Sequence, residues 1–331
     1  MKRYTTKSKI VAFAICVLLL TVFAGCHGAR TVDEPEPPPT AVNPSGPGEE
    51  PGEEPGESLH PTISIPGISA DNYPRIDGST ANLPLMAKLY SGICGVSEEE
   101  AETMVSVSGG TGEAWRSMVW DNADLLIVYE APDGVMEELK NNGIEVDVRP
   151  IGRDGLVFLV NKANPVEGLT TKQLQDIYTG KATDWKDVGG EPGPIVAYQR
   201  NEQSGSQTLF LKLLMKGLKP MQAPTELVPG MMSGLIEAVA GFNSDGGAIG
   251  YSVFYYADLM YANPDIKILS VDGVTPSNGT IGSGDYPFVN DFYVVIRAND
   301  PEDSPARILR DWLLSDEGAA LMREANYVPI G

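Results

Sequence analysis

The sequence predicts an α/β protein in which helices cover a mostly parallel sheet. Short apolar segments, such as the Leu-Leu-Ile-Val run at 125–128, alternate along the chain with longer amphipathic segments, and this alternation is typical of α/β folds. The composition agrees, because 42% of the residues are hydrophobic and 21% are charged, as in ordinary soluble globular proteins. The 331 residues of the chain are enough for one large or two medium domains.

The alternation begins near Asn72. A strand-like segment leads into Gly-Ser-Thr at 78–80, and a second one leads into Gly-Gly-Thr-Gly at 109–112. In chain order we expect a strand at 73–77, a helix at 81–93, a strand at 101–108, a helix at 113–122, a strand at 123–132, a helix at 134–143, and strands at 145–152 and 155–161.

The rest of the chain keeps the same pattern. Thr170 has the position of an N-cap and Gly180 that of a C-terminal stop, which together bound a helix at 170–180. The elements expected after it are a strand at 193–200, helices at 208–217 and 231–241, strands at 246–254, 266–273 and 286–297, one helix at 305–325, and a docked tail at 326–331. We interpret the aromatic run at 251–261 as core, with a platform for sugars or peptides as the alternative.

The first residues do not belong to this fold. Basic residues precede an apolar run at 10–24 that is short for a membrane span, and Gly25 and Cys26 follow it. This arrangement resembles a bacterial lipoprotein signal. We therefore expect residues 1–25 to be a signal peptide and Cys26 to carry a lipid such as palmitate. An ordinary secretory signal or an anchor helix is the alternative.

Residues 26–69 are expected to link that anchor to the fold. The segment is rich in Pro, Gly and Glu and has almost no apolar side chains to bury, so we expect it to be disordered. Proline and like charges both extend such a chain. The linker then acts as a spacer between membrane and fold.

Composition and motifs argue against several classes of protein. A net charge of −21 does not suit nucleic acid, whose phosphate backbone binds basic surfaces. The two histidines, His27 and His60, both lie in the linker, which argues against His-based triads and His-rich zinc sites. Phosphate-loop, nucleophile-elbow and dinucleotide motifs are missing from the sequence. We therefore expect no enzyme, no cofactor and no metal. Cys94, the one cysteine of the fold, is expected to be a small buried hydrophobe.

Three segments place small hydroxyl residues or glycines directly before a helix, at 77–80, 108–112 and 203–206. The first N–H groups of a helix are unpaired and carry a partial positive charge. Each segment alone is most simply an N-cap. At the carboxyl ends of strands in an open α/β sheet, however, all three can converge on one crevice. They would then form a cage of donors for an oxyanion.

Two charged residues flank the third segment. Arg200 adds a forked cation that matches the geometry of an oxyanion. Glu202 stands two residues later and is placed to orient the Arg200 side chain. The alternative is a surface ion pair worth under about 1 kcal/mol.

Within the segment 123–132, the apolar strand ends in Glu130 before a Pro turn, and Glu130 is expected near the same crevice. A carboxylate there tolerates only an anion that still carries a proton, because it would otherwise face a like charge. Phosphate carries such a proton near neutral pH and sulfate does not. Glu130 is therefore expected to select phosphate over sulfate. The alternative is that Glu130 caps a neighbouring loop.

Residues 72–331 resemble the phosphate-binding proteins of bacterial ABC importers, in particular the lipoproteins of Gram-positive bacteria. The most specific likeness is the run from Leu156 to Trp185, with its Asn-Pro-Val, Leu-Thr and Ile-Tyr-Thr-Gly-Lys motifs, together with Arg-x-x-x-Ser-Gly-Ser at 200–206. Further likeness lies at 77–80, 109–112, 123–132, 246–257 and 312–331.

The resemblance implies a two-domain type II periplasmic-binding-protein fold, with the ligand cleft between domains that two crossing strands join. Domain I would comprise 70–162 and 252–331, and domain II would comprise 163–251. The family's ligand positions fall on Arg200, on Ser204, Gly205 and Ser206, on Ser79 or Thr80, on or near Thr111, and on Glu130, with Glu202 as the acid that orients the arginine. Glu130 departs from the family's Asp, Ser206 from its Thr and Thr111 from its Ser.

The resemblance further implies a function. The protein would be a monomeric, lipid-anchored receptor on the outer face of the cell membrane that delivers inorganic phosphate to the permease and ATPase subunits of an ABC importer. Its only membrane contact would be the lipid anchor. A receptor for another oxyanion or a small organic phosphate is one alternative. A surface sensor or adhesion protein that retains the fold is another.

Overall fold

The computed structural model describes residues 62–241 and 247–330, which belong to one compact unit. The predicted signal peptide, the lipid site at Cys26 and the linker up to residue 61 lie outside the described residues. The predicted division of the fold at 162/163 and 251/252 stays a prediction.

A mixed sheet forms the centre of the described part of the chain. Six strands follow the order β1-β2-β9-β3-β6-β5, and the short strands β7 and β10 also pair with β3. These strands are β1 (Ile76–Gly78), β2 (Leu125–Val128), β3 (Val146–Asn161), β5 (Val196–Ala197), β6 (Ala248–Val253), β7 (Ile266–Ile268), β9 (Val289–Arg297) and β10 (Val328–Pro329). Strands β4 (Gly168–Leu169) and β8 (Ser270–Val271) form a separate parallel pair.

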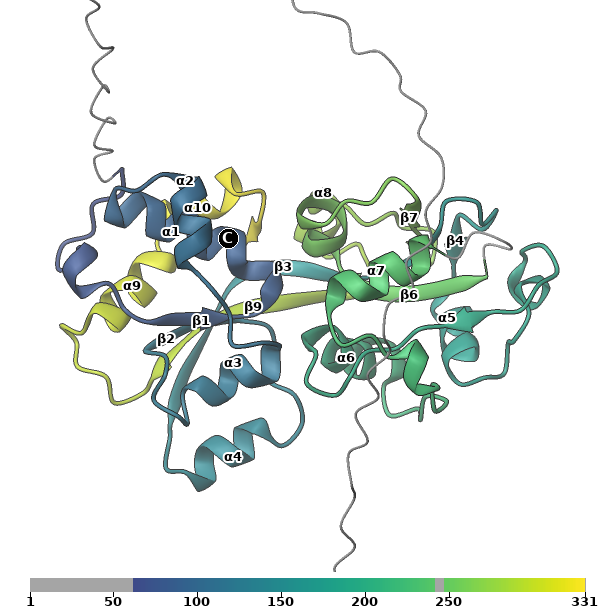
Figure 1. The fold of residues 1–331 in the computed structure, drawn as a ribbon, viewed down its shortest axis with the longest axis horizontal. Helices are drawn as coiled ribbons and strands as arrows, with labels where there is room; N and C mark the ends of the chain where they lie inside the picture. The colour runs from purple at the N-terminus through teal and green to yellow at the C-terminus, as the bar shows by residue number, and fades with distance from the viewer. Residues whose placement is uncertain (1–61, 242–246, 331) are drawn as a thin grey trace, which may run out of the picture. The chain divides into compact units, whose positions relative to one another are not determined.

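The α/β class is confirmed, but the prediction of a mostly parallel sheet is wrong. Within this sheet β1 pairs with β2, and β5 with β6, in parallel. All pairs of the long strands β3 and β9 are antiparallel. Figure 1 shows β3 and β9 running side by side through the fold. The long strands β3 and β9 run antiparallel to their neighbours and make the sheet mixed. The alternation of strands and helices along a sequence does not show the direction of such strands.

Strand β3 was expected as two strands and is one strand of 16 residues. Its pairing register with β9 shifts between Pro150 and Gly152, just before the break that the sequence suggested at 153–154. Proline has no N–H to donate to a ladder, and a bulge accommodates such a residue without ending the strand. At the predicted break itself, Arg153 and Asp154 pair with Asp291 and Asn290 of β9, so the strand continues through it.

The helices surround this sheet (Figure 1). They are α1 (Leu83–Cys94), α2 (Glu98–Met104), α3 (Thr111–Ser117), α4 (Val135–Asn141), α5 (Thr171–Tyr178), α6 (Gly205–Leu209), α7 (Met232–Ala240), α8 (Asn278–Ser283), α9 (Pro305–Leu313) and α10 (Asp316–Glu324). Thr170 caps α5 by accepting a hydrogen bond from Gln173 N, as predicted. A π-helical segment, Phe210–Met215, continues α6.

One strand prediction and one helix prediction are wrong, and an N-cap explains each. The strand expected at 101–108 is replaced by α2, because Ser97 accepts a hydrogen bond from Glu100 N at 3.1 Å and acidic residues fill the first turn. The single helix expected at 305–325 is two helices. Ser315 follows the first of them and caps α10 by accepting from Gly318 N at 3.3 Å.

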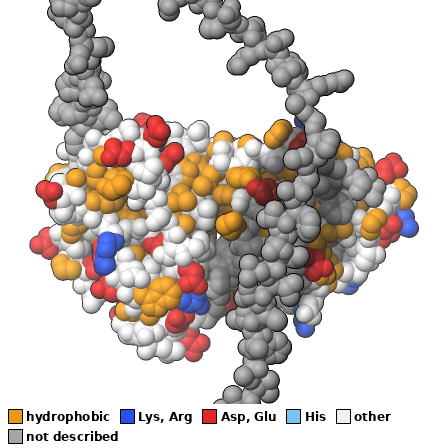
Figure 2. Space-filling view, viewed as in Figure 1, with side chains coloured by type: hydrophobic (Ala, Val, Ile, Leu, Met, Phe, Trp, Pro, Cys, Tyr) orange, Lys and Arg blue, Asp and Glu red, His pale blue; other side chains and the backbone are white. Residues whose placement is uncertain are grey.

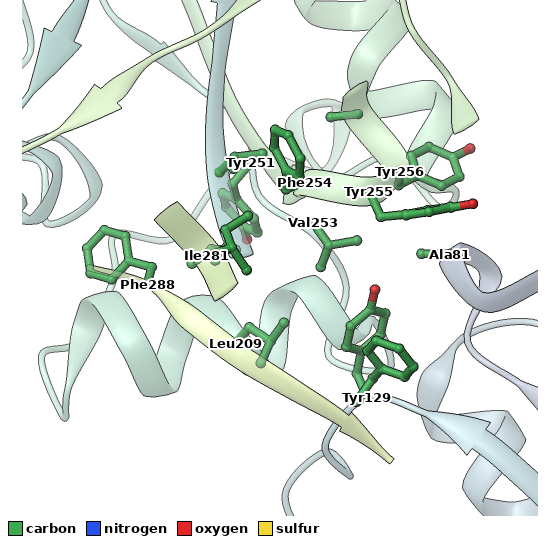
Figure 3. Close-up of a cluster of buried hydrophobic side chains, with 14 of the residues drawn as sticks. Ala81, Tyr129, Leu209, Tyr251, Val253, Phe254, Tyr255, Tyr256, Ile281 and Phe288 are labelled. Atoms are coloured by element: carbon green, nitrogen blue, oxygen red, sulfur yellow. The ribbon is translucent and has the colours of Figure 1, made fainter. Parts of the chain in front are cut away.

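Aromatic side chains fill much of the core. Tyr251 is fully buried and stacks on Phe210 with ring centroids 4.4 Å apart, and Tyr255 stacks on Tyr327 at 3.8 Å. Figure 3 shows Tyr255 and Tyr256 beside Ala81, with Tyr129 facing them from another part of the chain. The interpretation of the run at 251–261 as core therefore holds for its buried members. Cys94 is only partly buried and packs against the edge of this core.

The surface reflects the acidic composition. Figure 2 shows Asp and Glu side chains scattered over one face, between hydrophobic and uncharged groups. Among residues 62–241 and 247–330, no helix combines the length and the apolar character that crossing a membrane requires.

Candidate anion-binding site

The structure brings the three glycine- and hydroxyl-rich segments together at one cavity of about 590 Å³. The first segment contributes Ser79 and Thr80, the second Gly110 and Thr111, and the third the residues from Ser204 to Ser206. Ser79 follows β1 directly, and Ser204 precedes α6. The second segment follows helix α2, and no strand leads directly into it, so the expected pattern of strand, segment and helix holds only in part.

Hydroxyl groups connect these segments. Ser79 Oγ lies 2.8 Å from Thr111 Oγ1 and accepts a hydrogen bond from the backbone N–H of Tyr129 at 3.1 Å. Ser204 Oγ lies 2.9 Å from Ser206 Oγ. All four hydroxyl residues are buried. Because a hydroxyl can donate or accept, this cluster can turn several O–H groups toward an anion.

Glycine allows the segments to approach each other closely. A Cβ atom at Gly205 would lie 2.4 Å from Thr111 Oγ1, so only glycine fits there without a shift of Thr111 or of the backbone. The backbone N–H of Gly112 donates to Gln203 O at 3.0 Å. The start of α3 is thereby fixed against the loop that leads into α6.

Arg200 is the only charged residue among those described around the cavity. It is 7% exposed. Its Nε and Nη2 donate to the backbone carbonyls of Pro229 and Gly230, each at 3.2 Å. Its Nη1 is buried without a hydrogen-bond partner in the part of the chain that the structure describes. Burial lowers the pKa of the guanidinium, which nevertheless stays charged in proteins.

The structure does not place Glu202 beside Arg200. Glu202 is exposed and lines a different cavity, and carbonyl groups orient the arginine instead. The loop that carries Glu202 turns so that Asn201 accepts from Gln203 N and Ser204 N–H bonds to Asn201 O. This turn directs the Glu202 side chain outward.

Glu130 also lies away from the candidate site. It forms an ion pair with Lys212, and it lines the same second cavity as Glu202. Strand β2 ends at Val128, and the residue that follows, Tyr129, lines the candidate site instead. The sequence did not reveal Lys212 as a partner, because the two residues lie 82 positions apart.

Several residues around the cavity were not predicted from the sequence. Tyr129 and Tyr256 come from the ends of different elements, and Met231 and Met232 from the start of α7. In a sequence, apolar and aromatic residues of this kind form the same pattern whether they lie in a hydrophobic core or in a binding site. Only the structure identifies them, because it places all four around the same cavity as Arg200.

Behind Tyr129 stands a buried acid on β3. The Tyr129 hydroxyl donates to Asp154 Oδ2 at 2.6 Å, and Asp154 Oδ1 accepts from Gly155 N at 2.7 Å and Tyr255 N at 3.1 Å. Burial raises the pKa of Asp154 to about 6, although the hydrogen bond from Tyr129 lowers it. This network fixes Tyr129 at the cavity wall.

The family model of the PBP superfamily domain matches residues 67–317. The chain is 26% identical over 259 residues to the phosphate-binding protein PstS of Bacillus subtilis, covering 77% of this chain and 80% of the relative. It is also 26% identical over 264 residues to the phosphate-binding protein PstS of Staphylococcus saprophyticus, covering 77% of this chain and 79% of that relative. The predicted resemblance is therefore confirmed.

Solved structures agree on the fold. A Clostridium perfringens protein assigned as a phosphate ABC transporter substrate-binding protein, solved with bound phosphate, is 24% identical with a TM-score of 0.58, covering 77% of this chain and 99% of that chain. An ABC-type phosphate transport receptor from Vibrio cholerae is 23% identical with a TM-score of 0.55, covering 76% of this chain and 98% of that chain. The type II periplasmic-binding-protein fold is thus confirmed. Since the family model spans most of the described fold, this chain belongs to the PBP superfamily.

Proposed function

We propose that this protein captures inorganic phosphate outside the cytoplasm for an ABC importer. The observation that carries the proposal is Arg200, a buried cation whose Nη1 lacks a hydrogen-bond partner among the described residues and which lines a cavity rich in hydroxyl groups. A buried charge without an opposite charge is costly. An oxyanion in the cavity compensates it and accepts the remaining N–H groups.

The proposed ligand contacts come from all three segments. Arg200 supplies the charge and a planar fork of donors. The hydroxyls of Ser79, Thr80, Thr111, Ser204 and Ser206 and the backbone at Gly205 supply neutral donors. Neutral donors suit an anion inside an acidic protein, since local dipoles rather than net charge hold it. No catalytic group is part of the proposal, in keeping with relatives that are named as binding proteins.

The proposal includes the cellular setting. The protein would be held at the outer face of the cell membrane by lipid on Cys26, would act as a monomer, and would hand phosphate to permease and ATPase subunits on other chains. The names of the relatives support phosphate as the ligand, and the transport-receptor relative supports delivery to a transporter. The anchor rests on the sequence alone.

Calorimetry with Arg200→Ala tests the site. We expect the Kd for inorganic phosphate to rise at least tenfold, or about 1.4 kcal/mol, because the variant loses the only described charge that faces the ligand. Arg200→Lys should weaken binding less than alanine does, since it keeps the charge but not the fork. Arg323→Ala, at an exposed arginine of α10, is the matched control. Unchanged affinity in Arg200→Ala would exclude this cavity as the phosphate site.

A further inference from the structure

Strand β3 divides the sheet into two parts. Within 146–155 it pairs with β9, and within 156–160 it pairs with β6. Strands β1 and β2 lie beyond β9, and β5 lies beyond β6; we refer to these parts as the β9 half and the β6 half. The segment at 77–80 follows β1, and that at 108–112 leads into α3, which packs on β1 and β2. The segment at 203–206 lies between β5 and α6 and therefore belongs to the β6 half.

Two hydrogen bonds join these halves at Gln203. Its carbonyl oxygen accepts from the backbone N–H of Gly112 at 3.0 Å, and its Oε1 accepts from Nη1 of Arg116 at 2.5 Å. Both donors belong to α3. The N–H of Gln203 donates to Asn201 Oδ1 at 3.0 Å, which fixes the residue within its own loop. Gln203 thus holds the loop before α6 against α3 with both its main chain and its side chain.

Two glycines of the second segment allow this contact. A Cβ atom at Gly112 would lie 2.4 Å from Gln203 Oε1, and one at Gly110 would lie 3.0 Å from Gln203 O. Neither glycine has a positive φ, so the backbone conformation there does not require glycine. The close approach of Gln203 is the physical reason for both, because a side chain at either position would push Gln203 away from α3.

Arg116 meets Gln203 from a fixed position. Its Nε donates to Glu138 Oε2 on α4 at 2.8 Å, its Nη1 lies 3.5 Å from Glu113 Oε1, and its side chain is 20% exposed. A hydrogen bond from a charged donor is stronger than one from a neutral donor, so Arg116 holds Gln203 more firmly than a neutral side chain would. Arg116 is not among the residues described around the cavity of Arg200.

The contact lies next to donors of the candidate site. Gly112 directly follows Thr111, and Gln203 directly precedes Ser204. Thr111 and Ser204 line the same cavity and come from different halves. Moving these two segments apart opens the space between them, and that movement breaks the bonds of Gln203. Contacts of this kind slow the departure of a ligand, because differences in affinity reside mostly in the dissociation rate.

We propose that Gln203 controls the release of phosphate, because its bonds to Gly112 and Arg116 hold the second and third segments together around the ion. Arg116 is a positioning residue, which acts on release through Gln203. This inference rests on the proposed function, since it concerns the same anion site. It adds a determinant of the dissociation rate that lies outside the proposed ligand contacts.

Variants at both residues test the inference on the chain without residues 1–25. A chase of radiolabelled phosphate with excess unlabelled phosphate gives the dissociation rate, and calorimetry gives the Kd. In Gln203→Ala and in Arg116→Ala we expect release to become about fivefold faster, as for the loss of one hydrogen bond to a charged group at a partly exposed place. The Kd should rise by the same factor, because the association rate should stay within about twofold. The double variant should release phosphate no faster than Gln203→Ala alone, since Arg116 acts through that residue.

The controls separate this effect from changes in charge and folding. Arg149→Ala removes an exposed arginine whose side chain bonds to Asp147 in the same strand, and it should release phosphate like the wild-type protein. All variants should keep the wild-type circular dichroism spectrum. Unchanged release in Gln203→Ala, or effects of the two substitutions that multiply in the double variant, overturns the inference and leaves the proposed function intact. Absence of phosphate binding by the wild-type protein overturns the proposed function, and the inference with it.

Discussion

At Arg200 the fold holds a buried guanidinium with two neutral carbonyl groups, and no carboxylate of the described residues pairs with it. Carbonyl dipoles satisfy N–H groups but do not neutralise the charge, so part of the cost of desolvation persists. A bound anion removes that cost. Phosphate should accordingly raise the thermal stability of the protein, as any ligand does that binds only the folded state.

Asp154 contributes a pH dependence of stability. Burial raises its pKa in the folded protein to about 6 from the ordinary value of 3.8, so the folded state binds the proton more tightly than the unfolded state. This contribution to the free energy of unfolding is full below about pH 4, is lost as pH rises to about 6, and is absent above. The shift corresponds to roughly 3 kcal/mol at most. In Asp154→Asn the side-chain amide does not titrate in this pH range, so this contribution is absent.

Denaturant unfolding at pH 4.5 and pH 7 measures this effect. The wild-type protein should lose more free energy of unfolding between these two pH values than Asp154→Asn does. Many other carboxyl groups titrate in the same window, so the difference between the two proteins is the decisive quantity. Asp303→Asn, at an exposed position, should behave like wild type. Equal changes in wild type and Asp154→Asn would show that Asp154 titrates as an ordinary acid.

At the scale of elements, the C-terminal tail connects the sheet to the wall of the cavity. Strand β10 pairs with β3 at Gly152 and Arg153. Just before it, the Tyr327 hydroxyl donates to Ala81 O at 2.6 Å, and Ala81 lines the cavity. The sequence predicted a docked tail, and the structure confirms it. The site of docking was not predictable, because Tyr327 and Ala81 lie 246 positions apart.

Tyr327→Phe should lower the free energy of unfolding by about 1–3 kcal/mol, because it leaves the buried carbonyl of Ala81 without this donor. Thermal or denaturant unfolding monitored by circular dichroism measures the change. Tyr261→Phe is the control, since its hydroxyl pairs with Glu237 at a more exposed place. It should change stability by less than about 0.5 kcal/mol. A loss in Tyr261→Phe as large as that in Tyr327→Phe would contradict the anchoring role of the tail.

At the scale of the whole molecule, the segments that build the site were easier to predict from the sequence than the partners of individual side chains. Local chemistry marks a helix start, so the segments at 77–80, 108–112 and 203–206 could be found without a structure. The partners of Arg200, Glu130 and Glu202 depend on contacts between distant parts of the chain. The mixed sheet escaped prediction for the same reason, since strand direction is set by β3 and β9 pairing across the fold.

The close approach of α6 to α3 leads to the last prediction. Gly205→Ala would place a Cβ atom 2.4 Å from Thr111 Oγ1 and 3.2 Å from Thr111 Cβ. Rotation of the Thr111 side chain would relieve the contact with Oγ1 only by breaking its hydrogen bond with Ser79, and it would not relieve the contact with Cβ, so the donors of the site shift in either case. Because donors have to converge to hold an anion, we expect the Kd for phosphate to rise by about fivefold or more, roughly 1 kcal/mol.

Gly193→Ala is the matched control, since a Cβ atom there meets no atom within 4 Å, and both variants should keep the wild-type circular dichroism spectrum. Calorimetric affinities of Gly205→Ala and Gly193→Ala within twofold of each other would mean that the contact between α6 and α3 does not shape the site.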